Sequence, residues 1–175
     1  MHPNVLVAYA TRTGSTEEVA QAIAEVLRNH DVSADLRCAK DISSTDQYVA
    51  VVIAAPLYMG RLHKEMRRFL STHRAALMKT QVVLFVLGPI QKEEKDWIGA
   101  KQQLEKELKK FSWLSPVAQY IVGGRFDPAR MGFPFNVIPA MRKIPASDAL
   151  DWDLIRDKAG ELATRFKSAE AAMQH

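Results

Sequence analysis

The sequence has only one cysteine, Cys38, in its 175 residues, so no disulfide can form within the chain. Cysteine and histidine do not occur at the spacing of a zinc site, which leaves neither disulfides nor structural zinc to hold the fold. A chain of this length can bury a sufficient core without such cross-links. We therefore expect one domain over residues 1–175, in the reducing cytoplasm, with no metal.

Long hydrophobic runs and blocks of like charge are also missing. No apolar run is long enough to cross a bilayer, and residues 1–4 lead into the apolar run 5–9 without the basic start of a signal peptide. The formal net charge of +4 is spread along the chain. We therefore expect no transmembrane segment and no nucleic-acid partner, with a mild preference for anionic molecules, acidic proteins or lipid headgroups.

The common nucleotide-binding motifs are absent as well. Neither Gly-x-x-x-x-Gly-Lys-Ser/Thr nor Gly-x-Gly-x-x-Gly after a strand occurs, which disfavours nucleotide hydrolysis and NAD binding. A receiver domain needs acidic residues at the end of its first strand, where this chain has Tyr9 and Ala10. Cys38 has no phosphate-cradling loop and arginine after it, which disfavours a cysteine phosphatase.

Five short β-branched runs alternate with amphipathic stretches, a pattern typical of a parallel sheet that is covered on both faces. The predicted strands are 4–9, 33–38, 49–55, 81–87 and 117–122. The predicted helices are 15–28, 62–77, 95–111 and 152 to about 167, the last with Asp151 as its N-cap. Residues 39–48 predict a short helical turn or loop. Right-handed crossovers then give an open, doubly wound α/β sheet that binds its ligand beyond the carboxyl ends of the strands.

A phosphate-binding loop is predicted between the first strand and the first helix. Hydroxyl groups on both sides of Gly14, together with the free N–H groups and the dipole of the helix, can hold an anion. An ordinary Ser/Thr helix cap is the alternative, but four hydroxyls exceed what a cap requires. The predicted loop consists of Thr11, Arg12, Thr13, Gly14, Ser15 and Thr16.

The pattern Thr11-x-Thr13-Gly14-x-Thr16 resembles the FMN phosphate loop of the flavodoxins, and the strand pattern follows that family over nearly the whole chain. Among flavodoxins, the chain is most similar to the menaquinone-dependent protoporphyrinogen oxidases of the flavodoxin type. That likeness rests on residues 54–63, on 123–126 with the long segment after it, and on 151–152. The resemblance implies a flavodoxin-like five-stranded fold, FMN as cofactor and a redox function related to heme biosynthesis.

The resemblance also implies how the flavin ring is held. Tyr58 offers a flat face, and Gly60 permits a backbone flip of Met59–Gly60 toward flavin N5; a plain turn with Tyr58 on the surface is the alternative. The loop after strand 81–87 lacks the second aromatic found in many flavodoxins, which leaves one ring face open to substrate or to Phe126. The implied cofactor-binding residues besides the phosphate loop are Pro56, Leu57, Tyr58, Met59, Gly60, Leu87, Gly88, Pro89 and Gly124. No catalytic side chain is assigned, because the flavin carries the chemistry.

Residues 124–148 form a long insertion that mixes apolar and basic side chains. It can hold a flat anionic substrate such as a porphyrin, or rest on an anionic membrane surface that contains quinone. A cap or a homodimer patch is the alternative. Two roles are considered for His63: proton transfer, or an ordinary position on the surface.

The leading hypothesis is an FMN oxidoreductase that passes electrons from a reduced substrate through FMN to an acceptor, in the cytoplasm or at the inner face of the membrane. The alternative is a flavodoxin-type shuttle that docks redox proteins. Such shuttles usually have a strongly acidic surface, and its absence here argues mildly against this alternative. A third possibility, an interaction module that has lost its flavin, is disfavoured by the intact hydroxyl loop.

Overall fold

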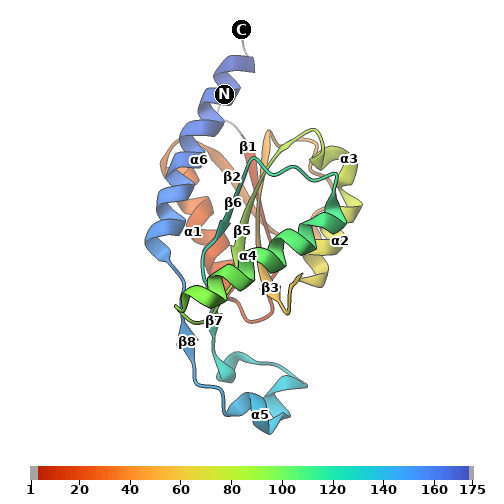
Figure 1. The fold of residues 1–175 in the computed structure, drawn as a ribbon. Coiled ribbons are helices and arrows are strands. Elements are labelled where there is room, and N and C mark those ends of the chain that lie inside the picture. The colour runs from red at the N-terminus through yellow and green to blue at the C-terminus, as the bar shows by residue number, and fades with distance from the viewer. Residues whose placement is uncertain (1–3, 174–175) are drawn as a thin grey trace.

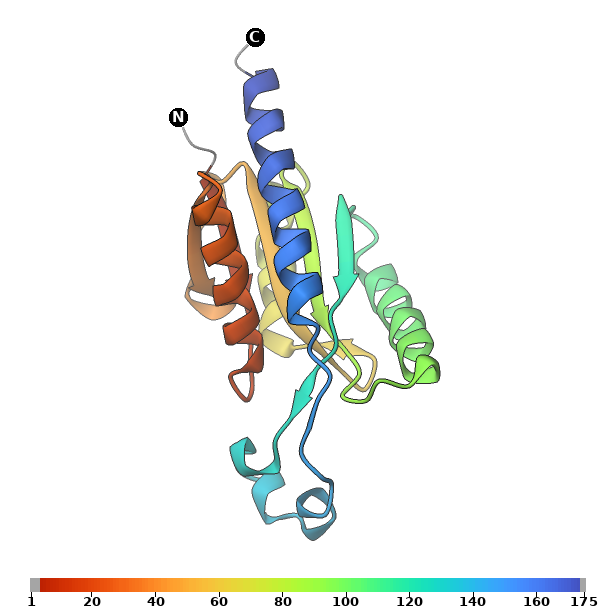
Figure 2. The same cartoon turned by 90° about the vertical axis from the view of Figure 1, so that its left-hand side faces the viewer.

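A computed structural model describes residues 4–173. Five parallel strands lie in the order β2-β1-β3-β5-β6, and helices cover both faces of the sheet (Figures 1 and 2). The strands are β1 (Asn4–Tyr9), β2 (Ser33–Cys38), β3 (Ala50–Tyr58), β5 (Gln81–Leu87) and β6 (Ala118–Ile121). The predicted doubly wound, flavodoxin-like α/β sheet is confirmed.

Each strand of the sheet contributes side chains to two separate cores. In β1, Val5 and Val7 pack in the core beneath α1 and α6, while Leu6 and Ala8 face the core beneath α2 and α4. Because successive side chains of a strand point to opposite faces, both sets must be apolar when both faces are covered. The helices are α1 (Ser15–Asn29), α2 (Lys64–Thr72), α3 (Arg74–Leu77), α4 (Glu94–Leu108) and α6 (Trp152–Met173). Short 3₁₀ turns occupy Ala39–Asp41 and Lys109–Phe111.

The segment expected to be a loop at 56–60 is instead the end of a strand and a tight hairpin. Strand β3 continues to Tyr58, and β4 (Arg61–Leu62) pairs with it antiparallel. The two turn residues, Met59 and Gly60, have φ values of 47° and 76°. This is the pattern of a type I′ hairpin turn, which requires positive φ at both positions. Pro56 and Gly60 lie close together in the sequence and are both typical of turns. The predicted strand therefore ended at residue 55 and missed the last three residues of β3.

The helix predicted over 62–77 is wrong in extent, since this stretch holds a strand end and two helices. Leu62 belongs to β4, and His63 caps α2 by accepting a hydrogen bond from the Glu65 N–H at Nδ1 (3.4 Å). The break between α2 and α3 falls at His73, whose Nε2 lies 3.2 Å from the Ile42 carbonyl oxygen. That tertiary contact has no signature in the helical spacing of the apolar residues.

One acidic residue of α4, Glu107, is fully buried. The Glu107 carboxylate accepts from the Leu62 N–H (3.3 Å) and from Lys110 Nζ (2.6 Å), and it lies 4.0 Å from Arg67 Nε. It thereby ties α4 to the hairpin and to α2. At the start of α6, the predicted N-cap is confirmed, because Asp151 Oδ1 accepts from the Leu154 N–H (2.9 Å).

The insertion is an ordered excursion beyond the carboxyl end of β6. Its neck is a two-stranded antiparallel ribbon, β7 (Arg125–Phe126) with β8 (Ser147–Asp148). Between them lie 3₁₀ turns at Pro128–Arg130 and Phe135–Val137 and the single-turn helix α5 (Pro139–Arg142). The insertion projects from the sheet at the end away from the C-terminus (Figures 1 and 2). Among the described residues, no helix combines the length and hydrophobicity needed to span a bilayer.

Candidate functional site

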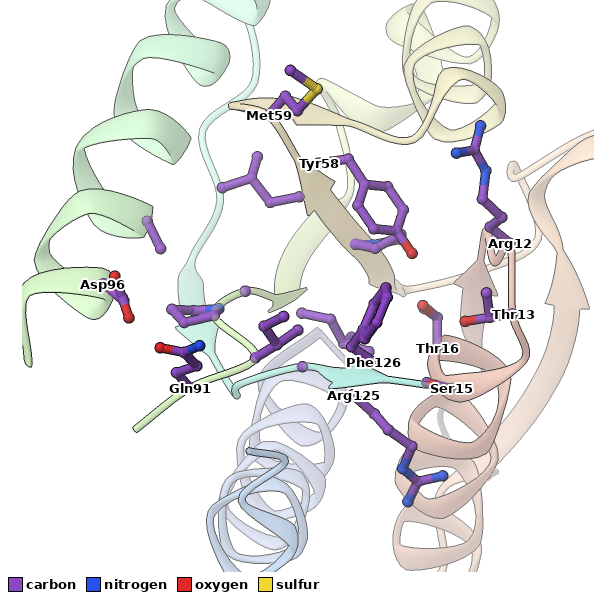
Figure 3. A pocket seen from close by; sticks show the side chains of 18 of the residues that line it. Arg12, Thr13, Ser15, Thr16, Tyr58, Met59, Gln91, Asp96, Arg125 and Phe126 are labelled. Atoms are coloured by element: carbon purple, nitrogen blue, oxygen red, sulfur yellow. The ribbon is translucent and has the colours of Figure 1, made fainter. Parts of the chain in front are cut away.

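A cavity of ≈690 Å³ opens at the carboxyl ends of β1, β3 and β5, within the usual size range of a small-molecule site. Figure 3 shows Thr13, Ser15 and Thr16 on one side of it and Gln91 and Asp96 on the opposite side. The predicted residues that line the cavity are Arg12, Thr13, Ser15, Thr16, Pro56, Leu57, Tyr58, Met59, Leu87, Gly88, Pro89 and Gly124. Three others, Thr11, Gly14 and Gly60, are not part of the lining.

The loop before α1 leaves the start of that helix without a side-chain cap. The N-cap residue is Gly14, at φ 93°, and it has no side chain to cap the helix. Thr11 accepts the Gly14 N–H at Oγ1 (2.9 Å), so its hydroxyl shapes the loop instead. The alternative of an ordinary Ser/Thr cap is therefore wrong. Thr16, only 2% exposed, and the buried Ser15 hold their hydroxyls at the cavity wall, where a phosphate could accept hydrogen bonds.

Arg12 connects the phosphate-loop side of the cavity to its aromatic wall. Its guanidinium carbon lies 5.8 Å from the Tyr58 ring centroid and 4.7 Å from that of Phe135 in the insertion. Burial raises the pKa of the Tyr58 phenol, an effect that the Arg12 charge partly offsets. Tyr58 is nevertheless 44% exposed and lines the cavity, so it remains accessible to a ligand there.

The Met59–Gly60 turn forms the rim of the cavity. Met59 is 99% exposed and holds a positive φ, which costs energy for a residue with a Cβ. The hairpin pairs Leu57↔Leu62 and Tyr58↔Arg61 hold the turn in this conformation. A backbone under such strain at a cavity rim is suited to change conformation when a ligand changes its hydrogen-bonding groups.

The third wall is built from backbones in close contact. The Gly124 N–H donates to the Pro89 carbonyl (2.8 Å), and a Cβ on Gly124 would lie 2.6 Å from the Gly88 carbonyl oxygen. A Cβ on Gly88 would likewise lie 2.8 Å from Ile121 Cγ2. A side chain at position 124 would push against the backbone of the Gly88 loop, whereas one at position 88 would require the Ile121 side chain to move.

Several lining residues were not predicted from the sequence. The insertion contributes Phe126, which was named as an open possibility, and also Met131, Phe135 and Met141. Helix α4 contributes Lys95, Asp96 and Gln103. The loop after β5 has no aromatic side chain, and Phe126 and Phe135 of the insertion bring aromatic rings to the cavity instead. The sequence does show several aromatic residues in this Pro-rich segment. Which of them point into the cavity depends on long-range packing, which the sequence pattern does not reveal.

His63 is not among the cavity-lining residues. It is partly buried, and burial lowers the pKa of its imidazole, which favours the neutral form that accepts the hydrogen bond at the start of α2. Its geometry is that of a helix cap, and nothing in it supports proton transfer.

Residues 6–138 match the family model described as Flavodoxin domain. The chain is 22% identical over 169 residues to Protoporphyrinogen IX dehydrogenase (quinone) of Escherichia coli strain K12, covering 90% of this chain and 93% of that protein. Among solved structures, a flavodoxin from the domain Archaea has a TM-score of 0.57 at 12% identity and covers 94% of this chain and 99% of that chain. Oxidised Flavodoxin 1 from Bacillus cereus has a TM-score of 0.53 at 15% identity and covers 94% and 97%.

The two structural likenesses show the fold, and the family match extends over most of the chain, from β1 into the insertion. The chain therefore belongs to the flavodoxin domain family and has FMN as its cofactor.

Proposed function

We propose that this protein is an FMN-dependent oxidoreductase that takes electrons from a reduced, anionic macrocycle such as a porphyrinogen and passes them to a quinone. The observation that carries the proposal is the extent of the cavity. It reaches past the phosphate loop and the hairpin to Phe126, Phe135 and Met141 of the insertion, so a second, largely apolar molecule has an apolar wall beside the cofactor. The near full-length similarity to a quinone-linked dehydrogenase of protoporphyrinogen IX supports this substrate class and acceptor.

The FMN phosphate is assigned to the opening of α1. The hydroxyls of Thr13, Ser15 and Thr16 and the uncapped N–H groups of the helix supply its donors. Thr11 holds the loop in shape through Gly14, and Arg12 adds positive charge. The donor set fits a phosphate monoester, because several short donors converge where no side chain of the N-cap residue intrudes.

The flavin ring is assigned to the hairpin and the backbone wall. Tyr58 offers its exposed ring face, Pro56 and Leu57 line the cavity beside it, and the Met59–Gly60 peptide lies at the rim to meet the redox-active edge. Backbone groups of 87–89 can bond the pyrimidine end, and Gly124 allows the close approach of that wall. FMN supplies the electron chemistry when bound, while the protein orients the ring and limits the access of water.

Anaerobic flavin spectroscopy tests this function. The purified protein, loaded with FMN, is mixed with protoporphyrinogen under argon, and the loss of the oxidised flavin band is followed; a menaquinone analogue is then added and the band should return. Reduction by the porphyrinogen and reoxidation by the quinone would support the proposal. A flavin that reacts with neither compound would overturn it.

An electron shuttle that docks redox proteins is the second candidate. The observation in its favour is the exposure of Tyr58 and Met59 at the rim, which leaves the site accessible to a protein surface. The same anaerobic experiment distinguishes the two, because a shuttle exchanges electrons with a flavodoxin reductase or a ferredoxin and leaves protoporphyrinogen unoxidised.

We further propose that the protein acts on the cytoplasmic side of a membrane, with the tip of the insertion resting on anionic lipid. Phe133 is 83% exposed, and Val137, Ile138 and Ile144 are exposed beside it. No acidic residue occurs over 128–146, which also holds Arg142 and Lys143. Cosedimentation with phosphatidylglycerol vesicles, but not with phosphatidylcholine vesicles, is expected. If the protein instead dimerises through this tip and ignores both vesicles, the membrane proposal is wrong.

A further inference from the structure

Glu18, in the first turn of α1, binds two arginines of the insertion. Its Oε2 accepts from Arg125 Nη1 (2.6 Å) and its Oε1 from Arg130 Nη1 (3.1 Å). Each carboxylate oxygen therefore has its own guanidinium partner. Burial alone would raise the pKa of this carboxyl group, but the bonds from the two arginines outweigh burial and hold its pKa below the usual value.

The same two arginines are bound within the insertion. Arg125 Nε donates to Asp148 Oδ2 (2.9 Å), on the strand opposite in the neck, and Arg130 Nε lies 3.7 Å from Asp127 Oδ2. Glu18 is thus connected through Arg125 to both strands of the neck. Cavity-lining residues follow each arginine directly, Phe126 after Arg125 and Met131 after Arg130. The position of these lining side chains depends on where Glu18 holds the arginines.

The cluster lies against the phosphate loop. The Glu18 N–H donates to the Gly14 carbonyl (3.1 Å), and Arg130 Nη1 is 4.0 Å from the point that a Cβ on Gly14 would occupy. A guanidinium at that position brings a positive charge to the Gly14 end of the phosphate loop, although Arg130 itself is not among the cavity-lining residues. It comes from the insertion, whereas the other phosphate donors all come from residues 11–16.

We propose that Glu18 is a positioning residue that holds the insertion over the cavity through Arg125 and Arg130, and that Arg130 thereby supplies charge to the FMN phosphate. The proposal rests on the proposed placement of FMN. Because binding couplings are reciprocal, a phosphate that is attracted by Arg130 must also stabilise the insertion in the position in which Glu18 binds Arg130. FMN is therefore expected to order residues 125–148, and riboflavin, which lacks the phosphate, is not.

Affinities for FMN and riboflavin, measured by quenching of flavin fluorescence, test the role of Arg130. Arg130→Gln is expected to weaken FMN about fivefold, the size of a partly exposed charge interaction, and to change riboflavin less than about twofold. Arg130→Lys, which keeps the charge, should retain the preference for FMN. Equal losses for the two flavins would overturn the proposal, since they would indicate a general packing defect.

Amide hydrogen exchange tests the role of Glu18. Exchange over 125–148 should be slower with FMN than with riboflavin, and in Glu18→Gln it should be several-fold faster than in the wild type with FMN bound. Glu17→Gln is the matched control, since Glu17 lies on the same helical turn and accepts from the Tyr9 hydroxyl (2.9 Å). If the two variants exchange alike, Glu18 does not position the insertion.

Thr13→Val separates failure of this inference from failure of the FMN placement. If Thr13→Val weakens FMN while the Glu18 and Arg130 variants behave as wild type, only the inference is wrong. If Thr13→Val has no effect on FMN affinity, the placement of the phosphate is wrong as well.

Discussion

Arg12 and Phe135 are far apart in the sequence, yet the Arg12 guanidinium carbon lies 4.7 Å from the centroid of the Phe135 ring. This cation–π contact joins the loop assigned to the phosphate to the middle of the insertion. A substrate held under the insertion would therefore lie next to the cofactor, with no independent substrate domain required.

Phe135→Ala is expected to slow the reduction of bound FMN by porphyrinogen about tenfold, because it removes an apolar wall of the substrate space. Stopped-flow absorbance under anaerobic conditions measures this rate. Phe133→Ala is the matched control, since Phe133 lies two residues away, is 83% exposed and does not line the cavity. Equal rates for the two variants would argue against a substrate beneath the insertion.

Removing single hydroxyls of the phosphate loop should weaken the binding of FMN. Thr13→Val and Ser15→Ala each delete one donor to a charged group, for which about tenfold in affinity is typical. Fluorescence titration with FMN and riboflavin gives the two affinities, and riboflavin should be affected far less. Ser168→Ala on α6, whose hydroxyl donates to the Thr164 carbonyl, is the control. Unchanged FMN affinity in both loop variants would count against the site.

Gly124→Ala should lower the free energy of unfolding by about 2 kcal/mol or more, because the new Cβ would lie 2.6 Å from the Gly88 carbonyl oxygen. Urea denaturation followed by circular dichroism measures the loss. Gly132→Ala serves as the comparison, since a Cβ there meets no atom within 4 Å and should leave the midpoint nearly unchanged. A wild-type midpoint for Gly124→Ala would mean that the two loops can separate without penalty.

Glu107→Leu is expected to cost about 3 kcal/mol of folding stability, because the buried Leu62 N–H loses its acceptor and Arg67 is left with an uncompensated charge nearby. Glu105→Leu, at an exposed position on the same helix, should change stability by less than about 0.5 kcal/mol. Chemical denaturation of both variants provides the measurement. Similar values for the two would show that Glu107 does not stabilise the hairpin.

We expect the titration of His63 to lower the folding stability of the protein as the pH falls. Burial lowers the pKa of its imidazole in the folded state. The unfolded chain therefore takes up this proton first, near pH 6.5, so the contribution of His63 is complete above that pH and is lost as pH falls toward the folded-state pKa. Between pH 7 and pH 5, His63→Asn should lose less stability than the wild type, because asparagine can cap the helix without titrating. Equal losses would exclude His63 as the cause.

The sheet could be predicted from the sequence because its strands are covered on both faces. In β1 both alternating sets of side chains enter a core, so the run 5–8 is apolar throughout and recognisable without tertiary information. The start of α6 could also be predicted from local sequence, because Asp151 and the Leu154 N–H that it accepts from are only three residues apart. The hydroxyls and the glycine of residues 11–16 are also adjacent in the sequence, so a loop of this kind could be recognised locally, and its binding of phosphate stays a prediction.

The remaining features depend on contacts between distant residues. Pro56 takes part in β3 because it lies opposite Leu87, in a register that only the folded sheet defines. Glu107 is buried because the Leu62 N–H needs an acceptor. Phe135 turns inward toward Arg12 while Phe133 faces solvent, although both stand in the same Pro-rich segment. No periodicity in the sequence distinguishes such pairs.

The narrow neck of the insertion has a practical consequence for engineering the chain. The chain leaves and re-enters the domain through two adjacent pairs of facing positions, Arg125↔Asp148 and Phe126↔Ser147, so the segment between Phe126 and Ser147 can vary in length without shifting a strand of the five-stranded sheet. A chimera that grafts a foreign loop between Phe126 and Ser147 should consequently fold as the parent does.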